Sequence, residues 1–324
     1  MRSYWIRATG SQTALEARDV ANPQPGPGQL LLRMRAAGLN RGELLVGHGL
    51  TAAGAAKPLG IEGAGELLSC GPGVSGFAPG ERLMGRVIGA FAEFGLMDAG
   101  DAIRVPQRLS WEQAAAVPIA FMVAHDVLVA QGGLKAGEWL LVLGVTSGVG
   151  VAALQAGKAL GARVIGTSGS AAKLDKLKPL GLDLPLQTRK GDFSDAVLEA
   201  TARRGADLAV NTVGGSVFPE AVRALAFQGR MAIIGYVDGS LTAEIDLDAV
   251  HAKRLRIFGG SNKMRNAEQR YENVRGLTQS LLPAIADGRI RPLIDGVFDF
   301  ADMAAAKRRM ETDAHAGKIV VRMP

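Results

Sequence analysis

A short apolar run that leads into a glycine-rich turn constrains the fold of this chain more than any other stretch. Residues 140–143 are all large and apolar, and residues 144–150 read Gly-Val-Thr-Ser-Gly-Val-Gly. Apolar residues at helical spacing follow, so the pattern predicts a buried strand, a tight turn and a helix. We expect Gly144 to make the turn, Gly148 to let a ligand approach the backbone, and Gly150 to allow the helix to pack closely.

The start of the predicted helix is suited to bind an anion. Backbone N–H groups without intrahelical partners and the helix dipole favour negative charge there, typically a pyrophosphate. An ordinary strand-to-helix connection has the same spacing, so the turn alone leaves both interpretations open. The phosphate loop of nucleoside triphosphatases is disfavoured, because no Gly-Lys-Ser/Thr sequence closes the turn.

Polar residues at the end of the next predicted strand indicate the kind of cofactor. Residues 162–167 read as that strand, and a Rossmann sheet that binds NAD(H) carries an acidic residue near its end. This chain has Thr167 and Ser168 there, and Lys173 just beyond. Hydroxyl groups and a cation favour a 2′-phosphate, and therefore NADP(H) over NAD(H). A solvated helix start would also suit Ser168 and Lys173, and it remains the alternative.

Length and composition limit the classes of protein to which the chain can belong. At 324 residues it is long enough for two domains. It has no run of about eighteen apolar residues and no apolar segment of a signal peptide at its N-terminus, so we expect no membrane span. The single cysteine, Cys70, excludes an intramolecular disulfide. The net charge of +6 is spread along the chain, which favours an anionic cofactor over nucleic acid. We therefore expect a cytoplasmic enzyme.

The two halves of the chain differ in pattern. The first hundred residues combine frequent Gly and Pro with short apolar runs, which predicts a strongly bent β domain. Ser110 and Gln113 form a capping box that begins a helix, and Pro118 interrupts that helix where the first domain ends. Strands and helices then alternate, with further strands predicted at 207–211, 230–235 and 255–259. Such alternation predicts an α/β fold whose parallel sheet binds ligands at the carboxyl ends of its strands.

Further short motifs stand in a fixed order along the chain. They are Pro-Gly-Pro-Gly at 25–28, Ala-Ala-Gly-Leu-Asn at 36–40, Pro-Leu-Gly-Ile-Glu-Gly-Ala-Gly at 58–65, Gly-Pro-Gly-Val at 71–74, Asn-Thr-Val-Gly-Gly at 211–215 and Gly-Lys-Ile-Val-Val at 317–321. With the glycine turn, they make the chain resemble the zinc-free quinone oxidoreductase branch of the medium-chain dehydrogenase/reductase superfamily, nearly from end to end.

The resemblance implies a fold, a domain order and an assembly. The fold is a Rossmann doubly wound parallel sheet inserted in a GroES-like β-rich domain. Residues 1–117 would form the GroES-like domain, residues 118–262 the NADP-binding domain, and residues 263–324 would return to complete the first domain. The resemblance also implies a homodimer.

Metal ligands of the zinc-dependent relatives are missing from this sequence. Those relatives carry a cysteine in the segment that reads Gly-Leu-Asn at 38–40, and Gly-His-Glu where this chain has Gly-Ile-Glu at 60–62. Because neither ligand is present, we expect no metal site. The histidines are expected to be structural or solvated, with only the first near Asn40 in sequence; they are His48, His125, His251 and His315.

Without a metal, reduction of an activated double bond is the chemistry that the residues favour. Alcohol oxidation needs a group that holds an alkoxide, and none is evident. Hydride addition to a quinone or an α,β-unsaturated carbonyl instead sends charge onto a carbonyl oxygen, which a few hydrogen bonds stabilise. The protein then mainly positions the nicotinamide against the substrate and excludes water.

The resemblance assigns roles to individual residues. It puts Asn40 beside the nicotinamide, where it would orient the substrate or the ring; a simple turn residue is the alternative. Quinone reductases often carry a tyrosine where this chain has Leu44 and Leu45, so Arg41 and His48 are the candidates for proton donation, unless they lie at the surface. The predicted cofactor residues are Gly144, Thr146, Ser147, Gly148, Val149 and Gly150 for the pyrophosphate, Thr167, Ser168, Lys173 and Arg189 for the 2′-phosphate, Asn211, Thr212, Gly235, Tyr236, Ser261 and Asn262 for the ribose and nicotinamide, and Lys318 of the tail.

The sequence therefore predicts an NADPH-dependent, zinc-independent reductase of quinones or other conjugated carbonyls. Two alternatives stay open. One is an enoyl-thioester reductase, whose proton-donating tyrosine is not found here. The other is a protein that binds NADPH without turnover, as a sensor or a structural protein.

Overall fold

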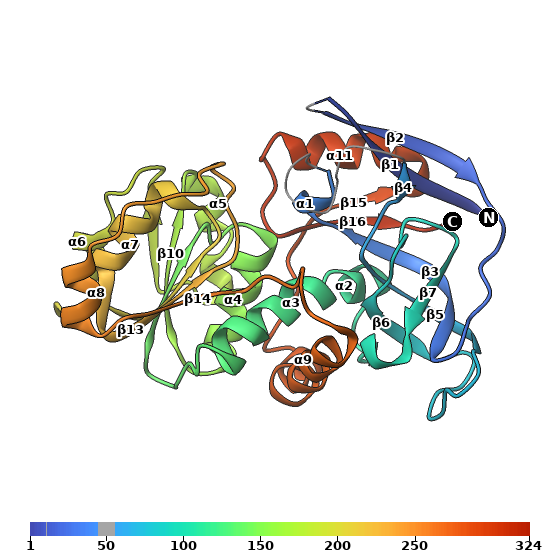
Figure 1. Cartoon of the computed structure of the whole chain (residues 1–324), viewed down its shortest axis with the longest axis horizontal. Coiled ribbons are helices and arrows are strands. Elements are labelled where there is room, and N and C mark those ends of the chain that lie inside the picture. The colour runs from blue at the N-terminus through green and yellow to red at the C-terminus, as the bar shows by residue number, and fades with distance from the viewer. Residues whose placement is uncertain (11, 45–55) are drawn as a thin grey trace. The chain divides into compact units, whose positions relative to one another are not determined.

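The computed structural model describes residues 1–10, 12–44 and 56–324. The described chain divides into two compact units (Figure 1). Unit 1 comprises Met1–Ile119, Ala267–Thr278 and Pro292–Pro324, and unit 2 comprises Ala120–Asn266 and Gln279–Arg291. The predicted closing segment, 263–324, is therefore divided between the units. Its residues 263–266 and 279–291 belong to unit 2. The backbone N–H of Arg291, for example, donates to Oε1 of Gln155 at 2.7 Å.

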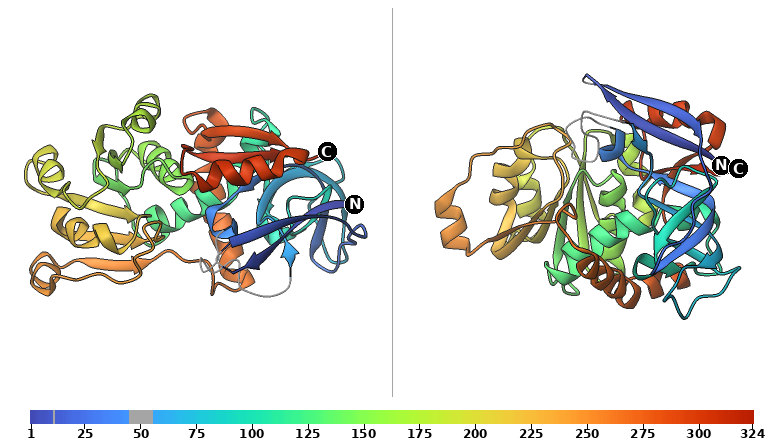
Figure 2. Two further views of the ribbon diagram at one scale, coloured as in Figure 1. Left: turned by 90° about the horizontal axis from the view of Figure 1, so that it is seen from above. Right: turned by 45° about the vertical axis from the view of Figure 1, so that its right-hand side comes forward.

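Two sheets make up the described part of unit 1 (Figure 2). The smaller has the order β2-β1-β4, and all its pairs are antiparallel. The larger has the order β15-β16-β3-β5-β6-β8, and β7 also pairs with β3. The bounds are β1 (Arg2–Thr9), β2 (Gln12–Asp19), β3 (Gln29–Leu39), β4 (Lys57–Pro58), β5 (Glu62–Cys70), β6 (Arg82–Arg86), β7 (Phe94–Asp98), β8 (Ala102–Arg104), β15 (Ile294–Asp299) and β16 (Lys318–Arg322).

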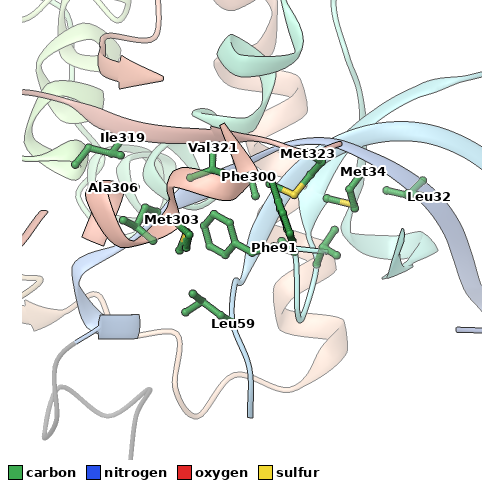
Figure 3. Close-up of a cluster of buried hydrophobic side chains, with 14 of the residues drawn as sticks. Leu32, Met34, Leu59, Phe91, Phe300, Met303, Ala306, Ile319, Val321 and Met323 are labelled. Carbon is green, nitrogen blue, oxygen red and sulfur yellow. The ribbon is translucent and has the colours of Figure 1, made fainter. Parts of the chain in front are cut away.

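The C-terminal strand completes the core of unit 1. β16 runs antiparallel to β3, with Ile319 opposite Leu39. Met34 of β3 and Phe300 and Met303 from the C-terminal segment belong to one buried cluster with Ile319 (Figure 3). Burial of each such side chain is worth about 1.5–3 kcal/mol. The same pairing carries the first residue of β16, Lys318, to the end of β3.

Few helices belong to the described part of unit 1. They are α1 (Arg41–Leu44), α2 (Trp111–Ala115), the start of α3 (Pro118–His125), most of α9 (Ala267–Ser280) and α11 (Met303–Glu311). The predicted capping box is confirmed, because Ser110 Oγ accepts from the Gln113 N–H at 3.2 Å and Gln113 Oε1 accepts from the Ser110 N–H at 3.0 Å. The interruption predicted at Pro118 is also confirmed, since α2 ends before it and α3 begins there.

A six-stranded parallel sheet forms the centre of unit 2, in the order β11-β10-β9-β12-β13-β14. The sheet grows outward from β9 on both sides, which makes the β9–β12 boundary the topological switch point where such sheets bind ligands. Its strands are β9 (Trp139–Leu143), β10 (Arg163–Ser168), β11 (Leu184–Gln187), β12 (Ala206–Asn211), β13 (Leu225–Ile233) and β14 (Arg256–Gly259). The strand predicted at 230–235 thus begins five residues earlier and ends two residues earlier.

Helices cover both faces of this sheet, as predicted. In Figure 1, α6, α7 and α8 lie on one side of the sheet and α4 on the other. The helix bounds are α4 (Gly148–Ala159), α5 (Ala171–Asp175), α6 (Ser194–Ala200), α7 (Phe218–Ala224), α8 (Leu247–Lys253) and α10 (Leu282–Asp287), and a π-helical turn at Asp126–Ala130 follows α3. Among the residues described, no helix is long and apolar enough to span a bilayer.

Candidate cofactor site and polar cluster

The glycine turn joins β9 to α4. At Gly144 and Gly150, neighbouring atoms leave no room for a Cβ. Gly144 has a φ of +76°, and a Cβ there would lie 2.5 Å from Oγ1 of Thr212. A Cβ on Gly150 would lie 2.4 Å from the carbonyl oxygen of Gly144. Ser147 caps α4, because its Oγ accepts from the Gly150 N–H at 3.0 Å. Gly144 therefore makes the turn, and Gly150 lets the helix pack against the turn itself.

Hydroxyl groups from the neighbouring strands hold this turn. The N–H of Gly144 donates to Oγ1 of Thr167 at 3.3 Å, and Oγ1 of Thr212 donates to the carbonyl of Leu143 at 2.8 Å. Thr167 and Thr212 are both buried. The hydroxyl groups of these two predicted cofactor residues thus bond to the main chain at the turn.

The end of β10 brings together the residues predicted for the 2′-phosphate. Ser168 Oγ lies 3.2 Å from Oγ1 of Thr146 in the turn. A Cβ on the next residue, Gly169, would lie 2.5 Å from Cγ and Nε of Arg189, so the arginine side chain lies directly over the backbone after Ser168. Lys173 is in α5, which begins three residues after Ser168. Ser170 caps that helix, and no carboxyl group lies between residues 168 and 174.

A cavity of about 450 Å³ lies at the carboxyl ends of β12 and β13. Asn211, Gly235 and Tyr236, three of the predicted ribose and nicotinamide residues, line it together with apolar side chains such as Phe218. The side chain of Asn211 is almost fully buried and closes the following turn, because Nδ2 donates to the carbonyl of Gly214 at 2.9 Å. Its Oδ1 accepts from two backbone N–H groups of that turn. Gly235 is partly exposed, so its backbone is the part of the cavity wall that a ligand could contact.

Ser261 and Asn262 follow the edge strand β14, and both are exposed. Neither lines the cavity at β12 and β13. These two predicted residues therefore lie outside the cavity that Asn211, Gly235 and Tyr236 line. Their role at the cofactor stays a prediction.

Unit 1 contains a cluster of charged and polar side chains that we call the polar cluster: Asn40, which is partly exposed, and Glu43, Glu62 and Lys318, which are buried. Nδ2 of Asn40 donates to Oε1 of Glu43 at 2.8 Å and to Oε1 of Glu62 at 2.9 Å. Nζ of Lys318 donates to Oδ1 of Asn40 at 2.8 Å and to Oε1 of Glu62 at 2.5 Å. Glu62 is 0%, Glu43 3% and Lys318 5% exposed. Two carboxyl groups and one ammonium group therefore surround a single amide inside the unit.

Strand pairing explains how three distant segments of the chain meet. β5 lies beside β3 with Gly63 opposite Ala37, and β16 lies on the other side of β3 with Ile319 opposite Leu39. A Cβ on Gly38 would lie 2.8 Å from Oε1 of Glu62, so the glycine makes room for that carboxylate. The second oxygen of Glu62 accepts from the Ile119 N–H at 2.8 Å.

Burial changes the protonation of one member of the polar cluster. The pKa of Glu43 is raised from 4.5 to about 7. Desolvation is the main cause and the charge of Glu62 adds to it, while the hydrogen bond from Asn40, the charge of Lys318 and a backbone hydrogen bond from Gly60 oppose the shift. A carboxyl group buried away from water is easier to keep neutral than ionised. Glu43 therefore binds its proton far more tightly than a solvated glutamate.

The sequence pointed to Asn40 and Lys318 but not to the two glutamates that join them. A signal was present for one of them. Glu62 keeps the acidic place of the Gly-His-Glu motif although the histidine is replaced by Ile61. A buried carboxylate without a metal ion beside it needs another cation to balance its charge. Lys318 supplies that cation to Glu62.

Of the two candidates for proton donation, Arg41 and His48, the structure describes only Arg41. The Arg41 guanidinium pairs with Asp313 and also donates to the carbonyl of Met310 at 3.4 Å, so it ties α1 to the end of α11. Burial lowers the pKa of Arg41. His48 lies outside the described residues.

The residues at the zinc-ligand positions do not fit a zinc ion. By the resemblance, the segment 38–40 and Ile61 stand where the zinc-dependent relatives have cysteine and histidine, and an ammonium group already occupies the oxygen-rich centre of the polar cluster. In the part of the chain that the structure describes, no group of three or more His, Cys, Asp or Glu side chains is arranged to hold a metal.

Two family models match separate parts of the chain. The alcohol dehydrogenase GroES-like domain matches residues 26–107. The zinc-binding dehydrogenase family matches residues 148–277. These matches fall on unit 1 and mostly on unit 2, respectively.

The first curated relatives are much longer proteins. A phenolphthiocerol/phthiocerol polyketide synthase of Mycobacterium tuberculosis is 32% identical over 321 residues, which is 98% of this chain and 15% of that relative. The chain thus spans a small part of the length of the first curated relatives that it matches.

Solved structures match nearly the whole chain. A mycobacterial protein in complex with NADPH is 27% identical with a TM-score of 0.87, covering 99% of this chain and 100% of that one. A mycobacterial quinone oxidoreductase is 26% identical with a TM-score of 0.86, and the CurK enoyl reductase is 25% identical with a TM-score of 0.86; each match covers 99% of both chains. An NAD-dependent alcohol dehydrogenase is 30% identical with a TM-score of 0.85 and is covered completely, as is this chain. The chain therefore belongs to the medium-chain dehydrogenase/reductase superfamily.

Proposed function

We propose that the protein is a cytoplasmic, NADPH-dependent and zinc-independent reductase that transfers a hydride to a quinone or an α,β-unsaturated carbonyl. The observation that carries the proposal is the end of β10, where hydroxyl groups and Arg189 meet directly beside the glycine turn and no carboxylate intervenes. The similarity to an NADPH complex and to a quinone oxidoreductase supports it. When bound, NADPH would supply the hydride from its nicotinamide ring.

The residues of unit 2 fit the phosphate groups of this cofactor. The first N–H groups of α4 have no intrahelical acceptor, and Ser147 satisfies that of Gly150, which leaves the N–H groups of Gly148 and Val149 for the pyrophosphate. Arg189 and Lys173 supply positive charge for the 2′-phosphate, and Ser168 supplies a hydroxyl. A cofactor with a free 2′-hydroxyl would leave this charge unused.

In unit 1, we propose that Asn40 lies beside the reacting groups. Hydride addition to a conjugated carbonyl needs hydrogen bonding to the oxygen that gains charge rather than a Lewis acid. The lack of the relatives' cysteine and histidine in the segments 38–40 and 60–62 suits that demand. Arg41 remains the proposed proton donor within the described residues, although it pairs with Asp313.

The first experiment follows cofactor oxidation by absorbance. NADPH and NADH are compared with a quinone, a simple enone and an enoyl thioester as acceptors, and with a saturated alcohol in the reverse direction, each with and without a chelator. We expect NADPH to reduce the quinone or the enone whether or not chelator is present. Activity with the alcohol alone, abolished by chelator, would reject the proposal.

Replacing Arg189 tests the cofactor preference. Because Arg189 would contact only the 2′-phosphate, Arg189→Ala should lower kcat/KM for NADPH by about 10- to 100-fold and leave that for NADH nearly unchanged. Lys190→Ala, a change at the exposed neighbouring cation, is the matched control. Equal losses with both cofactors would show that Arg189 is structural.

An enoyl-thioester reductase is the second candidate. It is favoured by the similarity to the CurK enoyl reductase and by matches within polyketide synthases. A strong preference for the enoyl thioester over the quinone in the same assay would select it. Tight NADPH binding without oxidation by any acceptor would instead select a sensor or structural protein.

We also propose that two copies associate through β14. This strand is one edge of the parallel sheet, Ile257 within it exposes 36% of its surface, and Leu247 of α8, the helix before it in sequence, exposes 71%. Exposed apolar side chains beside an open strand edge favour pairing with another strand. Light scattering should give the mass of a dimer, and Ile257→Lys should reduce it to that of a monomer; an unchanged mass would place the interface elsewhere.

A further inference from the structure

A second cavity of unit 2 lies at the edge of the parallel sheet opposite to the glycine turn. Its volume is about 690 Å³, and we call it the basic pocket. It is built where β9, β12, β13 and β14 begin, and its charged lining residues are Lys135, Glu138, Asp207, Arg230, Arg254 and Arg256. The predicted cofactor residues of unit 2 follow the carboxyl ends of the strands, so a ligand in the basic pocket would not occupy them.

Both acids of the basic pocket are already paired. Oε2 of Glu138 accepts from the buried guanidinium of Arg230 at 2.7 Å. Asp207 lies 3.7 Å from Arg204, and its Oδ2 accepts from the Trp139 N–H at 2.7 Å. Neither carboxylate is therefore left to neutralise the other cations of the pocket.

Arg230 is a fixed part of the pocket wall. Its Nε donates to the carbonyl of Asp207 at 3.1 Å, and Nη1 donates to the carbonyls of Gly132 and Gly133 at 2.7 Å and 3.1 Å. With the bond to Glu138, four of its five N–H groups are used. The structure thus forms this wall without a ligand.

Three further cations line the basic pocket without an acidic partner. Lys135, Arg254 and Arg256 are exposed, and within the described chain none of them forms an ion pair. Arg256 donates a long hydrogen bond, of 3.4 Å, to the carbonyl of Gln131. Like charges at one cavity repel one another, and an anion with two or more charges would relieve that repulsion.

Two residues of the basic pocket carry long side chains where the backbone favours glycine. Arg254, directly after α8, has a φ of +53°, and Gln228 has a φ of +59°. A left-handed backbone strains any residue with a Cβ, and glycine is the usual residue after a helix. Residues held in strained conformations cluster at binding sites. The strain at these two positions therefore indicates that their side chains are used.

An exposed aromatic ring lines the same cavity. Phe227 exposes 63% of its surface there. Nucleobases of any kind stack on such rings, and phosphate groups bind to Arg and Lys. Positive charge beside an exposed ring therefore suits a ligand that joins phosphates to a flat base.

We propose that the basic pocket binds a nucleotide, with its phosphates at Lys135, Arg254 and Arg256 and its base on Phe227. The proposal goes beyond the proposed function and does not depend on it, because the two sites lie at opposite edges of the sheet and share no residue.

Calorimetry with uridine diphosphate, pyrophosphate and uridine tests the proposal. Uridine diphosphate is the probe because its base is absent from the predicted cofactor. We expect uridine diphosphate to bind saturably, pyrophosphate to bind more weakly, and uridine not to bind at the same concentrations. Absence of saturable binding of uridine diphosphate, or binding of either fragment as tight as that of the whole nucleotide, would overturn the proposal.

Arg254→Gly separates binding from folding. Glycine relieves the left-handed strain, so this variant should unfold at the wild-type temperature or above it, yet bind uridine diphosphate about ten-fold more weakly. Arg189→Ala, which removes an arginine beyond the carboxyl end of β11, is the control and should keep the wild-type affinity. Unchanged affinity in Arg254→Gly, or a loss in Arg189→Ala instead, would overturn the proposal.

Phe227→Ala tests the place of the base. It should weaken the binding of uridine diphosphate about five-fold or more and leave that of pyrophosphate unchanged. The variants are compared under conditions in which light scattering gives each of them the mass of the wild type, so that assembly through β14 does not differ between them. Equal losses for the two ligands, or no loss for either, would overturn the proposal.

Discussion

The glycine turn of unit 2 and the polar cluster of unit 1 are built by opposite means. The turn consists of seven successive residues and depends on backbone that no side chain obstructs, at Gly144 and Gly150 above all. The polar cluster draws Asn40, Glu62 and Lys318 from three strands or their ends and depends on the balance of their charges. Added side-chain volume should therefore disrupt the turn. A change of side-chain charge at constant volume should disrupt the polar cluster.

The largest effect is expected from one added methyl group in the turn. A Cβ on Gly150 would lie 2.4 Å from the Gly144 oxygen and 2.8 Å from the Val145 backbone, so Gly150→Ala must move the start of α4. We expect NADPH affinity to fall about a thousand-fold, roughly 4 kcal/mol, because the N–H groups lose their alignment. Fluorescence titration measures it.

Gly259→Ala is the matched control, because no atom lies within 4 Å of the added Cβ. It should leave NADPH affinity near that of the wild type. Similar affinities for both variants would mean that the backbone of the turn does not hold the cofactor, and the contrast between the two regions would be lost.

The polar cluster should respond instead to an isosteric neutralisation. The pKa of Glu43 is raised from 4.5 to about 7 in the folded protein. The folded state therefore binds more protons than the unfolded state between these values. The contribution of Glu43 to the free energy of unfolding is fully present below about pH 4.5 and is lost as pH rises through about 7.

Glu43→Gln should remove this loss. Relative to the wild type, its free energy of unfolding should rise with pH between about 5 and 8, by at most about 3 kcal/mol. Urea unfolding at several pH values measures the difference, with Glu66→Gln as the surface control. A difference that does not change with pH would mean that Glu43 is ionised in the folded protein.

The same contrast explains which features the sequence could predict. The turn and its helix are local, so apolar spacing and three glycines were enough to predict strand, turn and helix. The end of β10 could be predicted because Ser168 and Lys173 lie at a known distance from that turn. Arg189 came from the family resemblance, and its position over Gly169 follows from the pairing of β10 with β11.

The polar cluster could be predicted only in part. Glu43 and Glu62 each read as an ordinary acid in the sequence, and their meeting depends on the pairing of β3 with β5 and β16. Whether a hydroxyl faces a ligand or the main chain is likewise set by strand register. Thr167 and Thr212 were therefore predicted as cofactor residues, although their hydroxyl groups bond to the turn.

The smallest effect is expected from the loss of one hydroxyl group that bonds to the main chain beside the turn. Thr212→Val keeps the shape of the side chain but removes the hydrogen bond from Oγ1 to the Leu143 carbonyl, which also accepts from the Thr212 N–H at 3.3 Å. We expect the free energy of unfolding to fall by about 1 kcal/mol and NADPH affinity to change less than about three-fold. Thr212→Ser, which keeps the hydroxyl, should restore the stability. If Thr212→Val instead weakened NADPH binding as much as Gly150→Ala, the hydroxyl would be a ligand of the cofactor. The turn would then depend on side chains as the polar cluster does, because space for the backbone alone would not account for its affinity.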